Sequence, residues 1–462
     1  MPQTPPAPHV PVAVERLLER LWQSGHAAYL VGGGLRDWLL GRPETDWDVA
    51  TDARPERIVD LFPQGRYENR FGTVTIDAVE VTTLRRDHQY ADHRRPDSVT
   101  FTGDVVSDLS RRDFTVNAIA WGRSGYETDD TTAPGWIDPT NGLADLAARR
   151  LRAVGDAHRR FDEDALRLLR AARLAAQLDF AIEPATLAAM VQAAPLVGHV
   201  SNERVGAEVR KMLRADPPSR GFGMLGEVGL LEHVLPELAE QVGVVQDKIP
   251  GNDLWQHSLL TLDAAAGLAP DGDRLRLAAL LHDIGKPRTA ADGRFIGHDT
   301  VGAQMADVLL TRLAWPRRVI APIVALIGGH MFSYERRWSD AAVRRFIRRT
   351  GRELVEEQLL LRQADNIGSA LAPDGGDLDE LRARVGEVLG EQPPLTVAEL
   401  AIDGHDLLAE LELAPGPLVG ELLERLLEAV IERPERNRRD ELLAAARQFL
   451  STRRPVDGRT TT

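Results

Sequence analysis

The sequence contains no cysteine, so it can form neither disulfide bonds nor thiolate metal sites. Any metal ion must therefore be bound by His, Asp or Glu side chains. No apolar stretch is long enough to span a membrane before Arg, Asp or Glu interrupts it. The proline-rich segment MPQTPPAPHVPV lacks the charged and apolar regions of a signal peptide, and we expect residues 1–11 to form a disordered tail. Together these absences predict a cytoplasmic protein.

Lysine is scarce as well, since it occurs only at Lys211, Lys248 and Lys286, and arginine carries almost all of the positive charge. The formal net charge of −14 argues against a protein that coats nucleic acids in general. Arginine keeps its charge and binds phosphate through two donors, so its local clusters are informative. Three clusters lie beside the motifs described below and favour phosphate contact, whereas the last is equally compatible with solvated helix faces. In chain order, the clusters are Arg85, Arg86, Arg94 and Arg95; Arg111 and Arg112; Arg149 through Arg173; and Arg344 through Arg352.

A chain of 462 residues is too long for one compact core, and its patterning changes along its length. Residues 12–150 mix strand and helix patterns, and residues 151–245 are rich in Ala, Leu and Arg at helical spacing. Residues 250–370 hold four of the twelve histidines, again on helical patterns, and residues 378–452 are predicted to form further helices. We therefore predict an α+β protein in which a mixed sheet with helices is followed by all-helical domains.

Paired carboxylates follow a glycine-rich turn in the segment LVGGGLRDWLLGRPETDWDVAT. A strand is expected to end at the glycines and a helix to begin there, which lets backbone N–H groups approach a phosphate closely. Asp46 and Asp48 lie two apart on a predicted strand, so both side chains would point to one face. Such oxygen ligands suit Mg²⁺, and two-metal phosphoryl transfer requires them beside a triphosphate. Glu80, which alternates with two valines, could supply a third carboxylate; the alternative is that these acids are simply exposed.

An arginine-rich helix is predicted over the segment FDEDALRLLRAARLAAQLDF. Asp164 and Arg167 lie three residues apart on it, and Arg170 and Arg173 continue the same face. One interpretation is a surface ion pair followed by a solvated basic stripe. The other is base recognition, because cytosine and adenine both present an amino group beside a ring nitrogen. A carboxylate can accept from that amino group while a guanidinium donates to the ring nitrogen, whereas guanine and uracil present a carbonyl instead of the amino group.

Histidine and aspartate recur in the segments LWQHSLL, LAALLHDIGK and LRQADNIG, which contain His257, His282, Asp283 and Asp365. A lone helical histidine is usually structural, but a His-Asp pair that ends an apolar run and precedes Gly-Lys is less common. The pattern resembles the signature of HD phosphohydrolases, which implies that these four residues bind a divalent metal that activates water. Some HD proteins use further histidines for a second metal, and His298 and His330 lie in the intervening sequence. The alternative is a metal-free HD fold that serves as an RNA-binding scaffold.

Several motifs together resemble a known family. The run from Tyr29 to Thr51, followed by FGTVTI, EVTTLRRDHQYADHRRP and DLSRRDFTVNAIA, is similar to the head domain of the polymerase β superfamily. It is more closely similar to class II tRNA nucleotidyltransferases (CCA-adding enzymes) and to bacterial poly(A) polymerases, with the resemblance extending over residues 28–370. The resemblance implies a polymerase β-like nucleotidyltransferase head, a helical neck and body, and a helical HD domain.

The resemblance also implies roles for individual residues of the head. Gly33 and Arg36 would contact the nucleotide, and Asp46 and Asp48 would hold Mg²⁺. Arg112, in RRDFTVNA, would contact the triphosphate or the sugar.

The EDxxR pattern at Glu163–Arg167 resembles the nucleotide-selecting motif of the same family. Base recognition by Asp164 and Arg167, with Arg170 and Arg173 in support, becomes the favoured interpretation of this segment. We expect one Asp–Arg pair to accept C and A and to reject G and U.

The predicted function is template-independent addition of C and A to the 3′ end of tRNA from CTP and ATP, with release of pyrophosphate. Poly(A) synthesis and addition of only CC or only A remain open, because these enzymes share the motifs. Intact head motifs argue against an HD phosphohydrolase whose head only binds nucleotide, and two metal-ligand sets argue against a noncatalytic RNA-binding protein. We expect Mg²⁺ at the head and Mn²⁺, Ni²⁺ or Co²⁺ at the HD site. The sequence predicts neither the oligomeric state nor the HD substrate.

Overall fold

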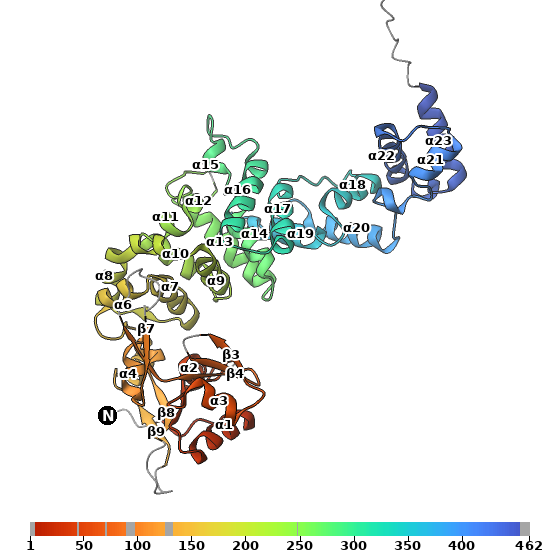
Figure 1. The fold of residues 1–462 in the computed structure, drawn as a ribbon. Helices are drawn as coiled ribbons and strands as arrows, with labels where there is room; N and C mark the ends of the chain where they lie inside the picture. The colour runs from red at the N-terminus through yellow and green to blue at the C-terminus, as the bar shows by residue number, and fades with distance from the viewer. Residues whose placement is uncertain are drawn as a thin grey trace, which may run out of the picture. The chain divides into compact units, whose positions relative to one another are not determined.

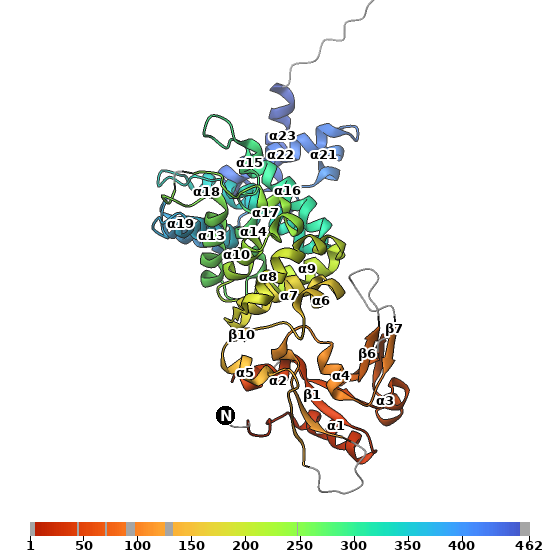
Figure 2. The ribbon, with the colours of Figure 1, turned by 90° about the vertical axis from the view of Figure 1, so that its left-hand side faces the viewer.

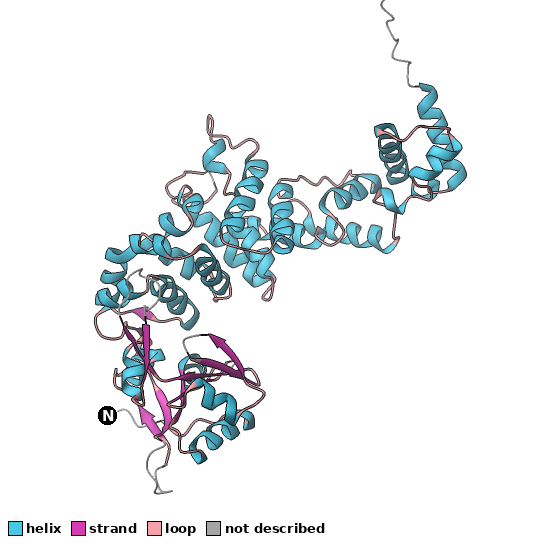
Figure 3. Cartoon of the chain, viewed as in Figure 1, coloured by secondary structure: helices cyan, strands magenta, loops and turns pink. Residues whose placement is uncertain are grey.

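The computed structural model describes residues 5–43, 46–69, 72–88, 98–124, 133–246 and 248–452. The chain divides into two compact units, Met1–Glu240 with Arg312–Trp315 and Gln241–Thr311 with Pro316–Thr462. Figure 3 shows strands in the first unit, whereas the described part of the second unit is built from helices. The predicted α+β class, a mixed sheet with helices followed by a helical remainder, is therefore confirmed. In the described ranges, no helix is both long and apolar enough to cross a membrane.

The first unit begins with a mixed sheet (Figure 1). Its strands are β1 (Ala28–Val31), β2 (Asp48–Thr51), β3 (Arg66–Asn69), β4 (Thr73–Ile76), β5 (Val79–Thr83), β8 (Ala120–Arg123) and β9 (Gly135–Ile137). They are ordered β3-β4-β5-β2-β1-β8-β9, and β2 and β5 run parallel. Every residue of β1 is buried, as expected for a central strand covered on both faces. The sheet therefore fixes β2 and β5, which carry the candidate carboxylates, beside each other.

Short helices flank this sheet. They are α1 (Val12–Gln23), α2 (Gly32–Leu39), α3 (Pro55–Leu61), α4 (Val105–Ser110), η1 (Thr115–Asn117) and α5 (Gly142–Ala147). A separate hairpin pairs β6 (Arg85–His88) with β7 (Ser98–Phe101), and Figure 2 shows the two strands side by side. Arg94 and Arg95 of the first arginine cluster lie outside the described residues. Within the segment expected to be a disordered tail, the carbonyl oxygen of Pro5 accepts a hydrogen bond of 2.9 Å from Trp136 Nε1.

Helices form the remainder of the first unit, apart from a short parallel pair, β10 (Arg150–Leu151) and β11 (Ala181–Ile182). They are α6 (Ala157–Glu163), α7 (Leu166–Leu178), α8 (Pro184–Ala193), η2 (Ala194–His199), α9 (Asn202–Met212), α10 (Ser219–Glu227), α11 (Leu231–Val234) and α12 (Pro236–Ala239). α7 packs against α9 and α10, and most of its residues are buried. α7 is thus a central helix rather than a surface helix.

Two local predictions are wrong. The segment containing Asp164 is not one continuous helix, because α6 ends at Glu163, Asp164 is extended (φ −147°, ψ 102°) and α7 starts at Leu166. The Asp164 side chain accepts a hydrogen bond from Leu166 N at 3.1 Å, the local bond by which Asp favours helix starts over helix interiors. The strand β2 starts at Asp48, so Asp46 precedes it instead of sharing it.

The second unit is built around α13, which packs along α14 and α19. Its elements are α13 (Leu254–Leu268), α14 (Asp273–Leu281), α15 (Lys286–Thr289), α16 (His298–Arg312), α17 (Arg317–Gly329), α18 (Asp340–Thr350), α19 (Val355–Gly368), α20 (Leu378–Gly390), η3 (Val397–Glu399), α21 (Gly404–Glu410), α22 (Pro417–Glu432), η4 (Pro434–Arg436) and α23 (Arg439–Thr452). A continuous hydrophobic cluster runs from Phe332 to Ala446 and joins α18 to the C-terminal helices.

The last arginine cluster stabilises the packing of α18 on α22. Arg344 Nε donates to the carbonyl oxygen of Ile431 at 2.6 Å. Arg345 forms ion pairs with Glu428 and Glu432, at 3.0 and 2.8 Å. Because these guanidinium groups contact the protein itself, phosphate contact is not needed to explain this cluster.

Candidate active site and candidate metal centre

A cavity of about 540 Å³ opens in the first unit where the glycine-rich turn, the carboxylate strands and α7 meet. Asp46 is not part of its lining, but its charge contributes to raising the pKa of Asp48. Of the residues predicted from sequence, the lining includes Gly33, Arg36, Asp48, Glu80, Arg112, Asp164, Arg167, Arg170 and Arg173. Segments far apart in the chain therefore supply one site.

The glycine-rich turn brings the start of α2 against the carboxylates. Gly32 has a φ of +79°, and a Cβ atom there would lie 2.5 Å from Asp48 Oδ2. A Cβ atom on Gly34 would lie 2.3 Å from the carbonyl oxygen of Asp46. A larger residue at either position would push the helix away. The two glycines thus hold the N-terminus of α2, which favours anions, at the edge of the cavity.

Asp48 and Glu80 are partners in the register between the parallel strands β2 and β5, so both side chains project from the same face. Burial raises the pKa of Asp48 to about 6, with further increases from the negative charges of Glu80 and Asp46. The positive charges of Arg112 and Arg36 lower it in part. A cation bound between these carboxylates would relieve their repulsion, so the donor set fits a hard divalent ion.

Arginine side chains line the cavity next to these carboxylates. Arg36 donates to Asn117 Oδ1 at 2.7 Å and to the neighbouring Asp37. Arg112 contacts Asp108 at 3.2 Å, and its buried Nε atom has no hydrogen-bond partner. A buried donor without a partner is costly, so the position of this side chain is not set by hydrogen bonding at Nε. The two guanidinium groups are suited to a triphosphate.

Asp164 and Arg167 do not form the ion pair that one interpretation predicted. Arg204 Nη2 donates to Asp164 Oδ2 at 2.7 Å. Arg167 is only 9% exposed, and donates to Glu163 at 2.8 Å and to the carbonyl oxygen of Arg111 at 3.1 Å. Each member of the pair is therefore fixed by its own partner, and both line the cavity. The prediction of a surface ion pair between Asp164 and Arg167 is wrong. Base recognition by these two residues is compatible with the geometry.

The basic stripe is not solvated either. Arg170 forms an ion pair of 2.6 Å with Asp113, and Arg173 one of 2.6 Å with Glu208. The partners Asp113, Glu208 and Arg204 are functional candidates that the sequence analysis missed. They lie 57, 35 and 40 residues from the side chains they contact, so no local spacing could identify them.

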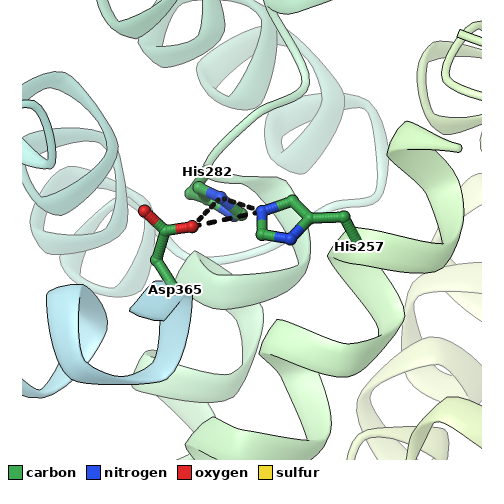
Figure 4. Close-up of side chains that lie close together, drawn as sticks. All are labelled: His257, His282 and Asp365. Carbon is green, nitrogen blue, oxygen red and sulfur yellow. Dashed lines mark hydrogen bonds and ion pairs between the residues drawn. The ribbon is translucent and has the colours of Figure 1, made fainter. Parts of the chain in front are cut away.

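Among its described residues, the second unit contains two groups of three potential metal ligands. The first is His257, His282 and Asp365, which we call trio 1 (Figure 4). The second is Asp283, His298 and His330, which we call trio 2. In trio 1 the Nε2 atoms of the two histidines are 3.2 Å apart, and Asp365 Oδ1 is 3.2 Å from His257 Nε2. The structure thus brings together all four predicted ligands and the two further histidines.

Asp283 lies between the two trios. Its Oδ2 is 3.1 Å from His282 Nε2 and 3.4 Å from His257 Nε2, while its Oδ1 is 3.3 Å from His298 Nε2 and 3.6 Å from His330 Nε2. One carboxylate therefore faces both groups of histidines, which is the arrangement of a bridging ligand.

All four histidines are oriented in the same way. Each Nδ1 lies within 2.6 to 3.1 Å of a backbone carbonyl oxygen, those of Gly368, Ala279, Phe295 and Ile327. A carbonyl oxygen accepts a hydrogen bond, so each Nδ1 carries the proton and each Nε2 is directed into the centre. Metal-binding histidines are commonly oriented by such bonds, and the donor set therefore fits first-row divalent ions.

The charges of this centre are strongly coupled. Burial alone would raise the pKa of Asp283, but the charge of His282 and hydrogen bonds from the histidines hold it well below its ordinary value. Burial would lower the pKa of His282, yet the charge of Asp283 and bonds to both carboxylates raise it to about 9. Burial lowers the pKa of His330. In the metal-free centre, positive charge on His282 thus favours the ionised form of Asp283.

A cavity of about 790 Å³ adjoins the centre. Its lining combines Asp365 of trio 1 and all three members of trio 2 with basic and apolar side chains. The basic residues are Lys248, Lys286, Arg294 and Arg362. The cavity can therefore admit an anionic ligand to the metal centre.

Comparisons with known proteins identify the domains in which the two candidate sites lie. The model of the poly A polymerase head domain matches residues 28–152, that of the probable RNA and SrmB-binding site of polymerase A matches residues 179–242, and that of the HD domain matches residues 254–369. Nucleotidyltransferases and HD proteins generally use divalent metals. Fold and sites together define a nucleotidyltransferase that also carries an HD domain.

Sequence relatives identify the family of nucleotidyltransferases to which the chain belongs. The chain is 32% identical to the CCA-adding enzyme of Geobacillus stearothermophilus, over 93% of its own length and 94% of the relative. It is 37% identical to the A-adding tRNA nucleotidyltransferase of Deinococcus radiodurans, over 87% and 91%. The crystal structure of the Bacillus stearothermophilus CCA-adding enzyme with CTP is 30% identical, with a TM-score of 0.66 over 95% of this chain and 97% of that one. The chain belongs to the family of tRNA nucleotidyltransferases that includes CCA-adding and A-adding enzymes, which confirms the predicted resemblance.

Proposed function

We propose that this protein adds C and A nucleotides to the 3′ end of tRNA from CTP and ATP, without a nucleic-acid template. The observation that carries the proposal is the cavity of the first unit, whose lining includes Asp48, Glu80 and Arg112 as well as Asp164 and Arg167. Carboxylates for a metal, cations for a triphosphate and an acceptor–donor pair for a base are thus available to one nucleotide. The CCA-adding relative and the CTP complex of the structural neighbour support the same substrates.

In the proposed reaction, the 3′ oxygen of tRNA bonds to the α-phosphorus of CTP or ATP and loses its proton to solvent. The bond between that phosphorus and the pyrophosphate oxygen breaks. Mg²⁺ at Asp46 and Asp48 would supply charge neutralisation and a more acidic 3′-hydroxyl. Glu80 completes the carboxylate face, and Arg36 and Arg112 balance the charge of the triphosphate. This scheme requires no side-chain general base.

The proposal is tested with Mg²⁺, labelled nucleotides supplied singly or together, and a tRNA that lacks its last three nucleotides. We expect CTP alone to extend this tRNA by two residues, ATP alone to extend it by none, and both to complete it. Extension by UTP or GTP at comparable rates would contradict the proposal.

Addition of A alone is a second candidate, favoured by the 37% identity to an A-adding enzyme. The same assay distinguishes A addition from CCA addition, because an A-adding enzyme extends only a tRNA that already ends in CC. Long products from ATP alone would instead indicate poly(A) synthesis.

Replacement of Asp164 with alanine should weaken discrimination against UTP and GTP more than it weakens triphosphate binding. The site would lose the acceptor that reads the amino group, whereas the phosphate-binding side chains would remain. We expect selectivity for CTP over UTP to fall by roughly 10- to 100-fold, as for one lost hydrogen bond to a charged group. Steady-state incorporation of each of the four nucleotides measures this.

Asp162→Ala is the matched control for Asp164→Ala, because Asp162 is exposed on α6 and does not line the cavity. Asp164→Asn sharpens the test, since its amide can donate to the carbonyl of uracil and should favour UTP further. Unchanged selectivity in both Asp164 variants would exclude base reading by this residue.

For the second unit, we propose hydrolysis of phosphomonoesters or 2′,3′-cyclic phosphates with Mn²⁺, Ni²⁺ or Co²⁺ at the HD centre. The four inward Nε2 atoms favour these ions over Mg²⁺, and the adjoining basic cavity suits a phosphate. We assign both reactions to the cytoplasm, because a chain without cysteine needs no oxidising compartment.

A further inference from the structure

A lysine occupies trio 1. Lys248 Nζ is 2.9 Å from Asp365 Oδ1 and 3.0 Å from His257 Nε2. It is also 3.9 Å from Asp283 Oδ2, the oxygen directed toward this trio. The ammonium group thus approaches the same atoms that would bind a metal ion.

Metal and ammonium cannot share this position. A first-row ion would lie about 2.0–2.2 Å from the histidine nitrogen and the carboxylate oxygen. Lys248 Nζ lies within hydrogen-bonding distance of the same two atoms, so the two cations would compete for the same ligand atoms. Strong repulsion would follow, because the ligand atoms for which the two cations compete are largely buried. Binding of a metal at trio 1 therefore requires Lys248 to leave.

The choice of lysine is itself informative. In a chain whose basic residues are nearly all arginine, two of the three lysines, Lys248 and Lys286, contact this centre. An ammonium is a compact point charge on a flexible stem and can replace a small ion, whereas a planar guanidinium cannot. Lys248 is 26% exposed at its side chain and borders the adjoining cavity, so it has space into which it can move.

Trio 2 differs from trio 1 in its contacts with lysine. Lys286 Nζ contacts Asp283 Oδ2 at 2.6 Å, on the side of that carboxylate that faces trio 1. Within the described residues, no lysine contact reaches His298 or His330 directly. An ion can therefore enter trio 2 without displacing a lysine from its histidines.

We propose that Lys248 is a resident cation of trio 1 that exchanges with a divalent ion, so that trio 2 fills first and trio 1 fills only at higher metal concentration. This inference rests on the proposed metal binding of the HD centre. In the metal-free state, the ammonium neutralises Asp365; in the loaded state, it is released into the basic cavity. Lys248 thereby sets the metal concentration at which the centre becomes binuclear.

Metal titration of the full-length protein tests the exchange. The protein is stripped with chelator and titrated with Mn²⁺, and the bound metal is measured by elemental analysis. Wild type should bind one ion tightly and a second weakly. Lys248→Met should bind the second ion about tenfold more tightly or better, because no competing state has to be vacated. Lys211→Met is the control, because Lys211 is the third lysine of the chain and lies in the first unit. It should leave the affinities for both ions unchanged.

Chemical labelling tests the movement itself. With only three lysines, acetylation followed by mass spectrometry reads each one separately. Mn²⁺ should increase the labelling of Lys248 several-fold, since the released ammonium is no longer in an ion pair, while Lys211 serves as the internal reference. This second measurement separates exchange from a general effect of removing one positive charge.

Unchanged labelling of Lys248 in a protein that binds two ions would overturn the exchange and leave the metal centre intact. Equal affinities of wild type and Lys248→Met would do the same. If neither protein binds a divalent ion, the proposed HD metal site itself fails, and the exchange fails with it.

Discussion

Replacing Asp48 with alanine is expected to reduce incorporation of both CMP and AMP by at least about 10³-fold, as for loss of several kcal/mol of metal-based stabilisation. Asp48 is the half-buried member of the carboxylate group and lies beside Glu80 in the strand register. Asp46→Ala should have the same effect, because Asp46 would hold the same ions. Binding of tRNA should remain nearly intact, since the metals act on the phosphoryl group. Single-turnover incorporation and a filter-binding assay measure the two properties.

Asp60→Asn provides the matched control for these head variants, because Asp60 is an exposed carboxylate near the end of α3, outside the cavity lining. It should retain full activity. Wild-type turnover by either Asp46→Ala or Asp48→Ala would refute the Mg²⁺ assignment. Loss of tRNA binding together with turnover would instead point to a role in folding.

The part of the head site that the sequence predicted well is encoded locally. Gly32 starts α2 directly after β1, as the glycine-rich turn indicated, and its φ of +79° is one that glycine adopts readily. Glu80 alternates with buried valines on β5, so its outward direction follows from strand geometry. Neighbouring residues in the chain determine these features, and patterns of a few residues are enough to predict them.

Features that depend on distant partners could not be predicted in this way. The helix break at Asp164 places its carboxylate against Arg204, 40 residues away. Helical spacing suggested instead that Asp164 would pair with Arg167, because periodicity assumes an unbroken helix. The ion pairs of Arg170 and Arg173 likewise depend on the packing of other elements around α7. Sequence patterns identified these side chains but could not identify their partners.

The HD centre also combines features that short sequence patterns predict with features that depend on distant segments. Adjacent His-Asp pairs occur at 282–283, 298–299 and 405–406. The first pair was predicted to bind metal because it ends an apolar run, and His298 of the second was named as a candidate for a second metal. In the structure His282 belongs to trio 1, and Asp283 and His298 belong to trio 2. His405 is exposed, and Asp406 pairs with Arg439 at 2.6 Å. The division of the ligands into two trios around Asp283 depends on α13, α14, α16, α17 and α19 meeting, which no single segment encodes.

Because the ligands of both trios meet at Asp283, removing it should affect both metal sites. The double variant His282→Ala with Asp283→Ala should lose divalent metal from both trios and all hydrolysis of phosphomonoesters or 2′,3′-cyclic phosphates. His282 is a member of trio 1, and Asp283 contacts the histidines of both trios. Elemental analysis of the purified protein and a hydrolase screen with Mn²⁺, Ni²⁺ and Co²⁺ measure the two losses.

Addition of nucleotides to tRNA should persist in this variant, because none of its altered residues lines the cavity of the first unit. The pair His405→Ala with Asp406→Ala is the matched control, since it removes the same two residue types from the surface of α21. It should keep both the metal and the hydrolysis. A wild-type protein that binds no first-row ion and hydrolyses nothing would make the HD domain a scaffold. If the His282→Ala, Asp283→Ala variant folds but loses CMP and AMP addition, the two sites are not independent. Their ligand sets share no residue, so only energetic coupling between the sites could explain such a loss.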